Sequence, residues 1–277
     1  MEYLTLNNGI VLPKIILGSF NVNNKNIMHE MIKTAVLEGE TGFDTSPSYG
    51  NEQILGDALL NAQIERQDLF ISDKIDGLQM FELNGEIEKH VDASLKKLNT
   101  TYLDLLLIHW PFEKYISGTW KSMERLYKNR KVLSIGLCNV DVRTFSQFLK
   151  NDIEILPHVI QIEISPFRTA NEDIRMFQNK GIVVQAYSPL CRMIKEIRES
   201  NILLEIAKKY NKSVAQVILR WHLDRNVVPV FTSSKPSRIK ENLDIFDFHL
   251  ETEEIQNINS LNKDYKIFPE SFGCPGY

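Results

Sequence analysis

The chain has 277 residues, of which 43% are hydrophobic and 25% charged, with a net charge of −4 and a pI near 5.9. These values are typical of soluble globular chains, and they exclude disorder, collagen-like repeats and coiled coil as the main architecture. The acidic balance provides no basic surface for nucleic acid or an anionic membrane, so we expect a small molecule as the partner.

The N-terminus has no basic segment followed by an apolar stretch, and no later run approaches the roughly 18 apolar residues of a membrane span. The three cysteines, Cys138, Cys191 and Cys274, are widely separated and form no C-x-x-C pair. This spacing argues against a disulfide framework and against a zinc knuckle. We therefore expect the whole chain to be the mature protein, a monomer in the reducing cytoplasm.

In chain order, Asn8-Gly9 lies between two short β-prone runs and predicts an N-terminal hairpin. Eight apolar runs follow, and most are continuous rather than alternating, as in strands buried on both faces of a parallel sheet. The runs are IILGSF (15–20), GFDTS (42–46), LFISDK (69–74), LDLLLIHW (103–110), VLSIGLCN (132–139), VIQIEIS (159–165), IVVQAYS (182–188) and VVPVFTS (227–233).

The stretches between these runs have helical periodicity. One apolar stripe between the third and fourth runs comprises Leu83, Ile87, Val91, Leu95 and Leu98. The runs start 23 to 45 residues apart, which is enough for a helix and two loops in each right-handed crossover.

This regular alternation predicts a closed (β/α)₈ TIM barrel over residues 1–277 as one domain, with a final helix near 251–262 and a tail. After the seventh strand, the longest interval has room for a short helix before its crossover helix. A Rossmann sheet is the alternative, but none of the 13 glycines forms the G-x-G of its fingerprint, and there is no Walker motif.

Four ionisable side chains stand at the ends of three consecutive predicted strands, where a barrel of this kind places its chemistry. Asp44 ends the second strand and Tyr49 follows in its loop, while Lys74 and His109 end the third and fourth strands. A lysine would stabilise a tyrosine phenolate, and an aspartate would keep that lysine charged when buried. His109 would hydrogen-bond to a substrate oxygen that gains negative charge. The set suits protonation of a carbonyl oxygen during attack by hydride.

Taken one at a time, these residues have simpler explanations. Asp44 resembles a loop or helix-capping residue, Tyr49 a packed aromatic, Lys74 a solvated strand end, and His109 a half-buried histidine. Only their joint placement favours catalysis. A metal site is not indicated, because the other histidines are scattered. A Schiff base at Lys74 is disfavoured by the neighbouring carboxylate.

The sequence resembles the aldo-keto reductase family over nearly its whole length. The resemblance is carried by eight segments in order: GFDTSPSYGNE (42–52), FISDK (70–74), LLIHWP (106–111), TWKSMERL (119–126), SIGLCN (134–139), IQIE (160–163), AYSPL (186–190) and SSKPSRIKEN (233–242). It implies a (β/α)₈ barrel that binds NADPH, or sometimes NADH, without a Rossmann unit. It also implies that Tyr49 is the general acid, with Asp44 and Lys74 tuning it and His109 orienting the carbonyl.

The same resemblance implies a set of cofactor contacts. Asn139 and Gln161 would hold the nicotinamide carboxamide, and Tyr187 would stack on the nicotinamide ring. Ser188 and Leu190 would line the pyrophosphate path. The adenosine end would be held by Ser233, Ser234, Arg238, Glu241 and Asn242. Without the motifs, barrel packing and loop capping would explain the first three residues, and Arg238 would be an ordinary helix residue.

Three positions depart from the family pattern. Thr232 replaces a lysine that usually pairs with the 2′-phosphate of NADPH, so use of NADH stays open. NADPH is still the first expectation, because Arg238 is kept and Lys235 is near in sequence. Cys138 replaces a serine, which weakens a hydrogen bond. Arg130 replaces a glycine in a surface turn.

The resemblance also implies an aromatic wall, including Phe20 and Trp110, around the substrate carbonyl. The loop after the fourth strand, from Pro111 to Thr119, is short, so we expect an open pocket for small aldehydes and ketones, with Phe268, Phe272 and Tyr277 available to close over it. Two functions stay open: an NAD(P)H-dependent carbonyl reductase, and a cofactor-binding sensor or regulatory subunit with little turnover. The complete set of four favours the first, because a protein that only binds the cofactor needs no acid.

Overall fold

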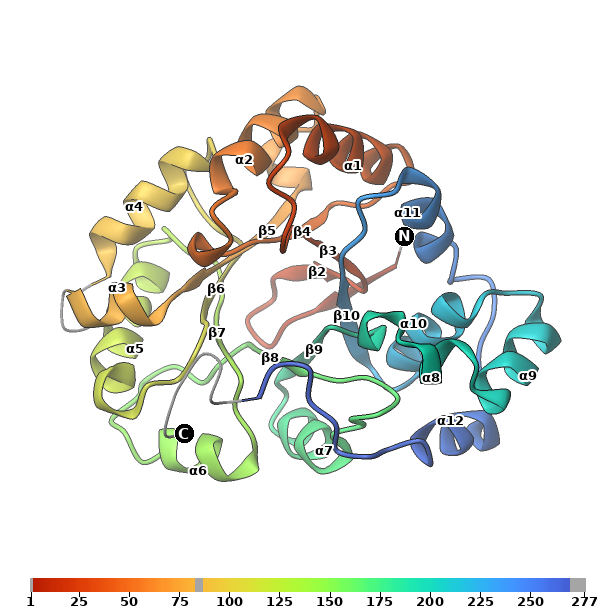
Figure 1. Ribbon diagram of the computed structural model, residues 1–277. Coiled ribbons are helices and arrows are strands. Elements are labelled where there is room, and N and C mark those ends of the chain that lie inside the picture. Colours follow the sequence, from red (N-terminus) through yellow and green to blue (C-terminus); the bar gives the residue numbers. More distant parts are fainter. Residues whose placement is uncertain (1, 83–86, 270–277) are drawn as a thin grey trace.

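Eight parallel strands close into a barrel in the order β10, β3, β4, β5, β6, β7, β8, β9, ringed by helices (Figure 1). The computed structural model describes residues 2–82 and 87–269. The barrel strands are β3 (Ile16–Gly18), β4 (Gly42–Asp44), β5 (Phe70–Ile75), β6 (Leu105–Ile108), β7 (Ile135–Cys138), β8 (Val159–Glu163), β9 (Val183–Tyr187) and β10 (Val227–Phe231). The predicted barrel is confirmed, and each strand lies within or next to one of the eight apolar runs.

Alternate residues of each strand pack on opposite sides of the barrel wall. Leu105 and Leu107 of β6 join the cluster inside the barrel, whereas Leu106 and Ile108 join the larger cluster beneath the helices. All four are buried because both faces of the sheet are covered. This explains why the strands are continuous apolar runs in the sequence.

The outer layer consists of the crossover helices and of shorter turns at the loops. The helices are α1 (Lys25–Leu37), α2 (Glu52–Asn61), α3 (Gly77–Glu82), α4 (Glu88–Lys97), α5 (Glu113–Lys128), α6 (Val142–Phe148), α7 (Asn171–Asn179), α8 (Lys195–Arg198), α9 (Asn201–Tyr210), α10 (Val214–Asp224), α11 (Pro236–Leu243) and α12 (Thr252–Asn259). Three 3₁₀ turns are η1 (Pro47–Tyr49), η2 (Arg66–Asp68) and η3 (Cys191–Met193). The predicted short helix and crossover helix are α9 and α10, and α12 is the predicted final helix.

The predicted stripe before β6 is confirmed where the structure describes it. Ile87, Val91, Leu95 and Leu98 are buried along α4 and its two caps. Leu83 lies outside the described residues.

The loop after β6 is shorter than expected. α5 begins at Glu113, so the predicted loop from Pro111 to Thr119 is wrong at its C-terminal end. Glu113 lies in the first helical turn, where a carboxylate is favoured by the helix dipole, and Ile116 is already buried against the core. The connection between strand and helix is therefore only 109–112.

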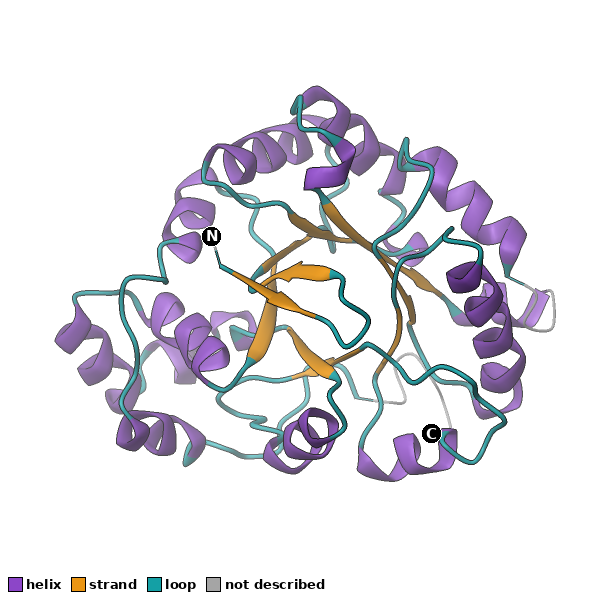
Figure 2. Ribbon diagram, turned by 180° about the vertical axis from the view of Figure 1, so that it is seen from behind, coloured by secondary structure: helices purple, strands orange, loops and turns teal. Residues whose placement is uncertain are grey.

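The predicted hairpin, β1 (Tyr3–Thr5) and β2 (Val11–Pro13), is antiparallel and covers one end of the barrel (Figure 2). Leu6 and Leu12 pack on residues inside the barrel, and Asn8 Nδ2 donates to Leu133 O at 2.9 Å, just before β7. Gly9 has φ +86°, a turn conformation that a side chain would strain. The hairpin thus closes the end at which the strands begin and leaves the opposite end open.

None of the helices in the described parts of the chain combines the length and apolar character needed to cross a membrane.

Candidate active site

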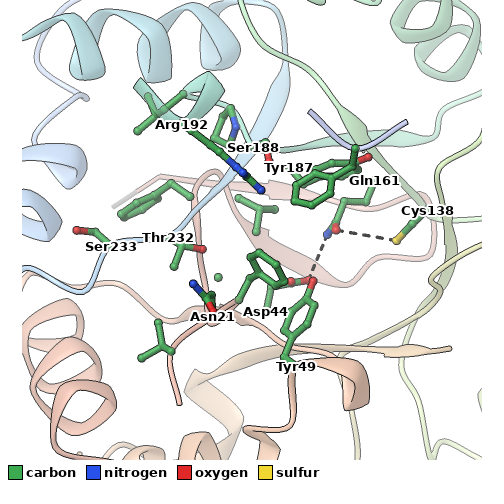
Figure 3. A pocket seen from close by; sticks show the side chains of 18 of the residues that line it. Asn21, Asp44, Tyr49, Cys138, Gln161, Tyr187, Ser188, Arg192, Thr232 and Ser233 are labelled. Atoms are coloured by element: carbon green, nitrogen blue, oxygen red, sulfur yellow. Dashed lines mark hydrogen bonds between the residues drawn. The ribbon is translucent and has the colours of Figure 1, made fainter. Parts of the chain in front are cut away.

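A cavity of about 1100 Å³ opens at the end of the barrel where the strands finish. Asp44 is the last residue of β4, Tyr49 the last of η1, and His109 follows β6; all three line this cavity. Figure 3 shows Asp44 and Tyr49 in the cavity wall. Lys74, near the end of β5, lies beneath them with 1% of its side chain exposed. The structure therefore brings together the four residues that the sequence singled out.

Lys74 connects the carboxylate to the phenol. Its Nζ donates to Asp44 Oδ1 at 2.6 Å and to the backbone oxygen of Thr45 at 2.8 Å. The same nitrogen lies 3.3 Å from Tyr49 Oη, within hydrogen-bond distance. Asp44 in turn accepts a hydrogen bond from Ser72 Oγ at 2.9 Å. Each member of the series is held by the next, as the sequence predicted.

The electrostatics of this buried group keep both Lys74 and Tyr49 protonated. Burial alone would lower the pKa of Lys74, but the Asp44 carboxylate outweighs it and the pKa lies above its ordinary value. Burial raises the pKa of Tyr49, and the opposing effect of Lys74 reduces this rise without cancelling it. A permanently charged lysine is a poor Schiff-base nucleophile, whereas a protonated phenol next to a cation suits proton donation.

His109 is held by a residue that the sequence analysis missed. Its Nδ1 hydrogen-bonds to Asp76 Oδ1 in the loop after β5. Asp76 Oδ2 accepts hydrogen bonds from Ser46 Oγ at 3.0 Å and from the backbone N–H of Ser48 at 2.9 Å. Burial by itself would raise the pKa of Asp76, but these hydrogen bonds hold it below its ordinary value. Asp76 belongs to no recognisable sequence motif. Its place directly after the end of β5 is the one sequence signal that could have pointed to the site.

Two amide side chains and a tyrosine form the next part of the wall. Asn139 Oδ1 accepts from Tyr187 Oη at 2.7 Å, and Asn139 Nδ2 donates to the backbone oxygen of His109 at 2.8 Å. Gln161 Nε2 donates to Asp44 Oδ2 at 3.2 Å and to Gln185 Oε1 at 2.9 Å. Both N–H groups of Gln161 are therefore used. Its oxygen accepts a weak hydrogen bond from Cys138 Sγ at 3.9 Å and has a second lone pair for a ligand, while Asn139 keeps one N–H to donate.

Comparisons with known proteins show the family to which the chain belongs. The family model described as "Aldo/keto reductase family" matches residues 14–263. The chain belongs to the aldo/keto reductase family. It is therefore an oxidoreductase that acts on carbonyl and alcohol groups.

Several individual aldo/keto reductases are similar over nearly their whole length. Glyoxal reductase of Bacillus subtilis is 41% identical over 270 residues, covering 97% of this chain and 95% of the relative. Methylglyoxal reductase DkgA of Escherichia coli O157:H7 is 33% identical over 270 residues, covering 96% of each chain. The crystal structure of a Bombyx mori aldo-keto reductase in complex with NADP has a TM-score of 0.88 and 28% identity, covering 98% of this chain and 95% of that chain.

The remaining predicted residues also line the cavity in this aldo/keto reductase, and Figure 3 shows Ser233 on the side away from Tyr49. Those that line it are Ser188, Leu190, Ser233, Ser234, Arg238, Glu241 and Asn242. Thr232 lines it as well, whereas Lys235 caps α11 and is exposed, outside the described lining.

Two further cations, Arg192 and Arg198, line the cavity and were missed by the sequence analysis. Arg192 extends toward the middle of the cavity from η3 (Figure 3). Its guanidinium also lies 4.9 Å from the centre of the Phe268 ring. The backbone between β9 and η3, and Arg192 itself, include residues in the left-handed conformation. This segment has no regular periodicity, so the direction of the Arg192 side chain could not be predicted from the sequence.

Aromatic residues surround the other end of the cavity. Phe20 and Trp110 line it as expected, and the Phe20 ring meets the Tyr49 ring edge-on at 5.1 Å. Phe268 joins them because Glu163 accepts the backbone N–H groups of residues 267 and 268 at 2.7 and 3.0 Å. Phe272 and Tyr277, the other predicted closing residues, lie outside the described part of the chain. Three further apolar residues that were not predicted from the sequence also line the cavity: Leu78, Phe81 and Phe112.

Proposed function

We propose that this aldo/keto reductase reduces small aldehydes and ketones to alcohols with NADPH as the hydride donor. The observation that carries the proposal is the continuous contact from Asp44 through Lys74 to Tyr49, with Tyr49 lining the cavity. In this proposal the chain acts as a single domain over residues 1–277. A monomeric state and a cytoplasmic location stay predictions from the sequence.

The cavity is suited to a dinucleotide with a small substrate beside it. Its volume of about 1100 Å³ exceeds the range of roughly 300–1000 Å³ that is typical for drug-sized ligands. Polar groups are spread along it, with the Asn139 and Gln161 amides near Tyr49 and the Arg238 guanidinium at the far end. The bound cofactor would supply hydride from its nicotinamide.

Side chains along the cavity would bind the nicotinamide and the pyrophosphate of the cofactor. Asn139 would donate to the nicotinamide carboxamide, and Gln161 would accept from it. The Tyr187 ring would stack on the nicotinamide. At the other end, Ser188 and Leu190 would line the path of the pyrophosphate, and Arg192, which faces the middle of the cavity, would add a cation to this path.

The adenosine would lie among the residues that line the far end. These are Ser233, Ser234, Arg238, Glu241 and Asn242. Arg238 would pair with the 2′-phosphate of NADPH. Because Thr232 carries no charge, one cation expected for that phosphate is missing, and we propose use of NADH in addition to NADPH.

Tyr49 would be the general acid that transfers the proton. As hydride reaches the carbonyl carbon, the phenol would donate its proton to the carbonyl oxygen. Lys74 would stabilise the phenolate left behind, and Asp44 would keep Lys74 charged and in place. His109, whose ring centre is 5.9 Å from that of Tyr49, would hydrogen-bond to the same oxygen and orient it.

The substrate would lie against Phe20, Trp110 and Phe268, close to Tyr49. The relatives named above reduce glyoxal and methylglyoxal according to their names, so we propose these 2-oxoaldehydes as the first substrates to test. The short connection after β6 favours small carbonyl compounds generally.

The test compares Tyr49→Phe with Tyr265→Phe, a control at an exposed tyrosine. Oxidation of NADPH is followed with glyoxal, methylglyoxal and a simple ketone, and cofactor binding is followed by quenching of tryptophan fluorescence, since Trp110 lines the cavity. We expect Tyr49→Phe to lose roughly 10²- to 10⁴-fold in kcat while it still binds NADPH. Full activity in this variant would refute the mechanism. Binding of NADPH by the unaltered protein without turnover of any carbonyl would instead favour the sensor function.

A further inference from the structure

His109 and Asp76 form a pair at the edge of the cavity, each with 17% of its side chain exposed. The contact joins His109 Nδ1 to Asp76 Oδ1. Asp76 is held on its other oxygen by the Ser46 hydroxyl and the Ser48 backbone amide. Its backbone N–H donates to Gln79 Oε1 at 2.9 Å, which fixes the turn that carries it. The carboxylate is therefore immobilised by groups from two strand-end loops.

These contacts decide which nitrogen of His109 carries a proton in the neutral ring. The Ser46 hydroxyl and the Ser48 backbone amide both donate to Asp76 Oδ2, and the pKa of Asp76 lies below its ordinary value, so its carboxylate is ionised. An ionised carboxylate only accepts hydrogen bonds. The single proton of the Ser46 hydroxyl is used on Asp76 Oδ2, although Ser46 Oγ also lies 3.2 Å from His109 Nδ1. Nδ1 must therefore be the donor in its contact with Asp76. The neutral ring then has a bare Nε2.

Nε2 is the nitrogen left for the substrate. Among the described residues, none hydrogen-bonds to it, and His109 lines the cavity. A bare Nε2 would face the carbonyl oxygen with one lone pair against another, which is repulsive. Only the doubly protonated ring presents an N–H at this position.

We propose that Asp76 is a positioning residue that fixes the Nδ1–H form of His109, so that His109 can donate to the carbonyl oxygen only as an imidazolium. This rests on the proposed function of His109 and adds a pH dependence to it. Carbonyl reduction then requires a protonated His109 and declines as the pH rises through its titration.

The groups that face the His109 ring come from several elements. Asp76 lies on one side, and the Tyr49 ring meets it nearly at right angles. Trp110 stacks beside it, with no charge. The Lys74 and Asp44 pair lies beyond Tyr49 and is held to itself at 2.6 Å. Asp76 is thus the charged group in direct contact with the imidazole among the described residues.

The variant Asp76→Asn should reverse the tautomer. The Ser46 hydroxyl and the Ser48 amide both require an acceptor, so the new amide would turn its oxygen toward them and its NH₂ toward His109. Nδ1 must then accept, and the neutral ring carries its proton on Nε2. This neutral ring can donate to the carbonyl oxygen without a second proton.

The tautomer is measured by two-bond ¹H–¹⁵N NMR of ¹⁵N-histidine-labelled protein over a pH series, with the His109 signal assigned by its loss in His109→Phe. We expect Nδ1–H in the neutral ring of the unaltered protein and Nε2–H in Asp76→Asn. Ser46→Ala, which removes one donor but leaves the carboxylate, should keep Nδ1–H. The same tautomer in the unaltered protein and in Asp76→Asn would overturn the proposal.

The second readout is the pH profile of kcat/KM for reduction. In the unaltered protein it should fall tenfold per pH unit above the His109 titration seen by NMR, and in Asp76→Asn it should stay level through that titration. Asp152→Asn, at a side chain that is 91% exposed, is the charge-matched control and should leave the profile unchanged. A uniformly lower rate with an unchanged profile would show that Asp76 only supports the structure. If no carbonyl is reduced at all, the proposed function fails, while the NMR result still decides what Asp76 does to His109.

Discussion

Lys74 Nζ donates to Asp44 Oδ1 at 2.6 Å, and the two side chains are only 1% and 4% exposed. An ion pair this deeply buried is held together strongly once formed, although removing both charges from water was costly. Because Lys74 also contacts Tyr49, the pair serves the proposed acid as well as the barrel.

Lys74→Met should therefore harm both stability and activity. The Asp44 charge would be left buried without its partner, which typically costs about 3–5 kcal/mol in free energy of unfolding. Adding Asp44→Asn removes the unpaired charge, so the double variant should recover much of the stability without recovering activity. Urea unfolding and kcat measured on both variants check this. Recovered activity in the double variant would contradict a catalytic role for the pair.

Thr232→Lys should shift the cofactor preference toward NADPH. Thr232 lines the cavity beside Ser233, so a lysine there would reach the 2′-phosphate proposed for this end. A solvent-accessible ion pair contributes up to about 1 kcal/mol, which corresponds to roughly a fivefold change in the ratio of dissociation constants. Titrations with NADPH and NADH measure the ratio. Lys235→Ala is the control and should leave the ratio unchanged, because Lys235 is exposed outside the described lining. An unchanged ratio in Thr232→Lys would mean that this loop does not contact the phosphate.

Glu40 should make the protein less stable as the pH rises from about 4.5 to 8. Burial raises the pKa of Glu40 to about 8, and the backbone N–H groups of Thr41 and Gly42 oppose this only in part. In the unfolded chain a glutamate titrates near 4.3, so between these values the folded state holds a proton that the unfolded state has lost. Stability is then fully present below the unfolded pKa and is lost as the pH rises through the folded pKa.

Glu40→Gln removes this titration and keeps an oxygen for the two amides. Each pKa unit corresponds to about 1.4 kcal/mol, so we expect the variant to gain a few kcal/mol over the unaltered protein between pH 4.5 and 8. Midpoints of urea unfolding at several pH values give the slope of stability against pH for the unaltered protein and for Glu40→Gln. Glu30→Gln, at an exposed glutamate on α1, should leave the slope unchanged. Parallel pH dependences in the unaltered protein and Glu40→Gln would show that Glu40 is ionised in the fold.

The barrel could be predicted because its strands are buried on both faces. Leu105 to Ile108 are all apolar for this reason, and turns and helices separate such runs at regular intervals. The start of α5 was placed too late because the first turn, at Glu113, is polar and shows no apolar period until Ile116. A helix end of this kind is defined by backbone geometry more than by side-chain pattern.

The amino-acid sequence by itself determined the strand order and the strand ends, and with them the gathering of Asp44, Lys74 and His109, because parallel strands all end at one mouth. Only the tertiary structure decided the contacts across that mouth. Asp76 reaches His109 33 positions away, and Arg192 turns into the cavity from a left-handed turn. Such contacts depend on loop conformations and side-chain directions, which have no periodic signature in the sequence and are set by the packing of the complete barrel.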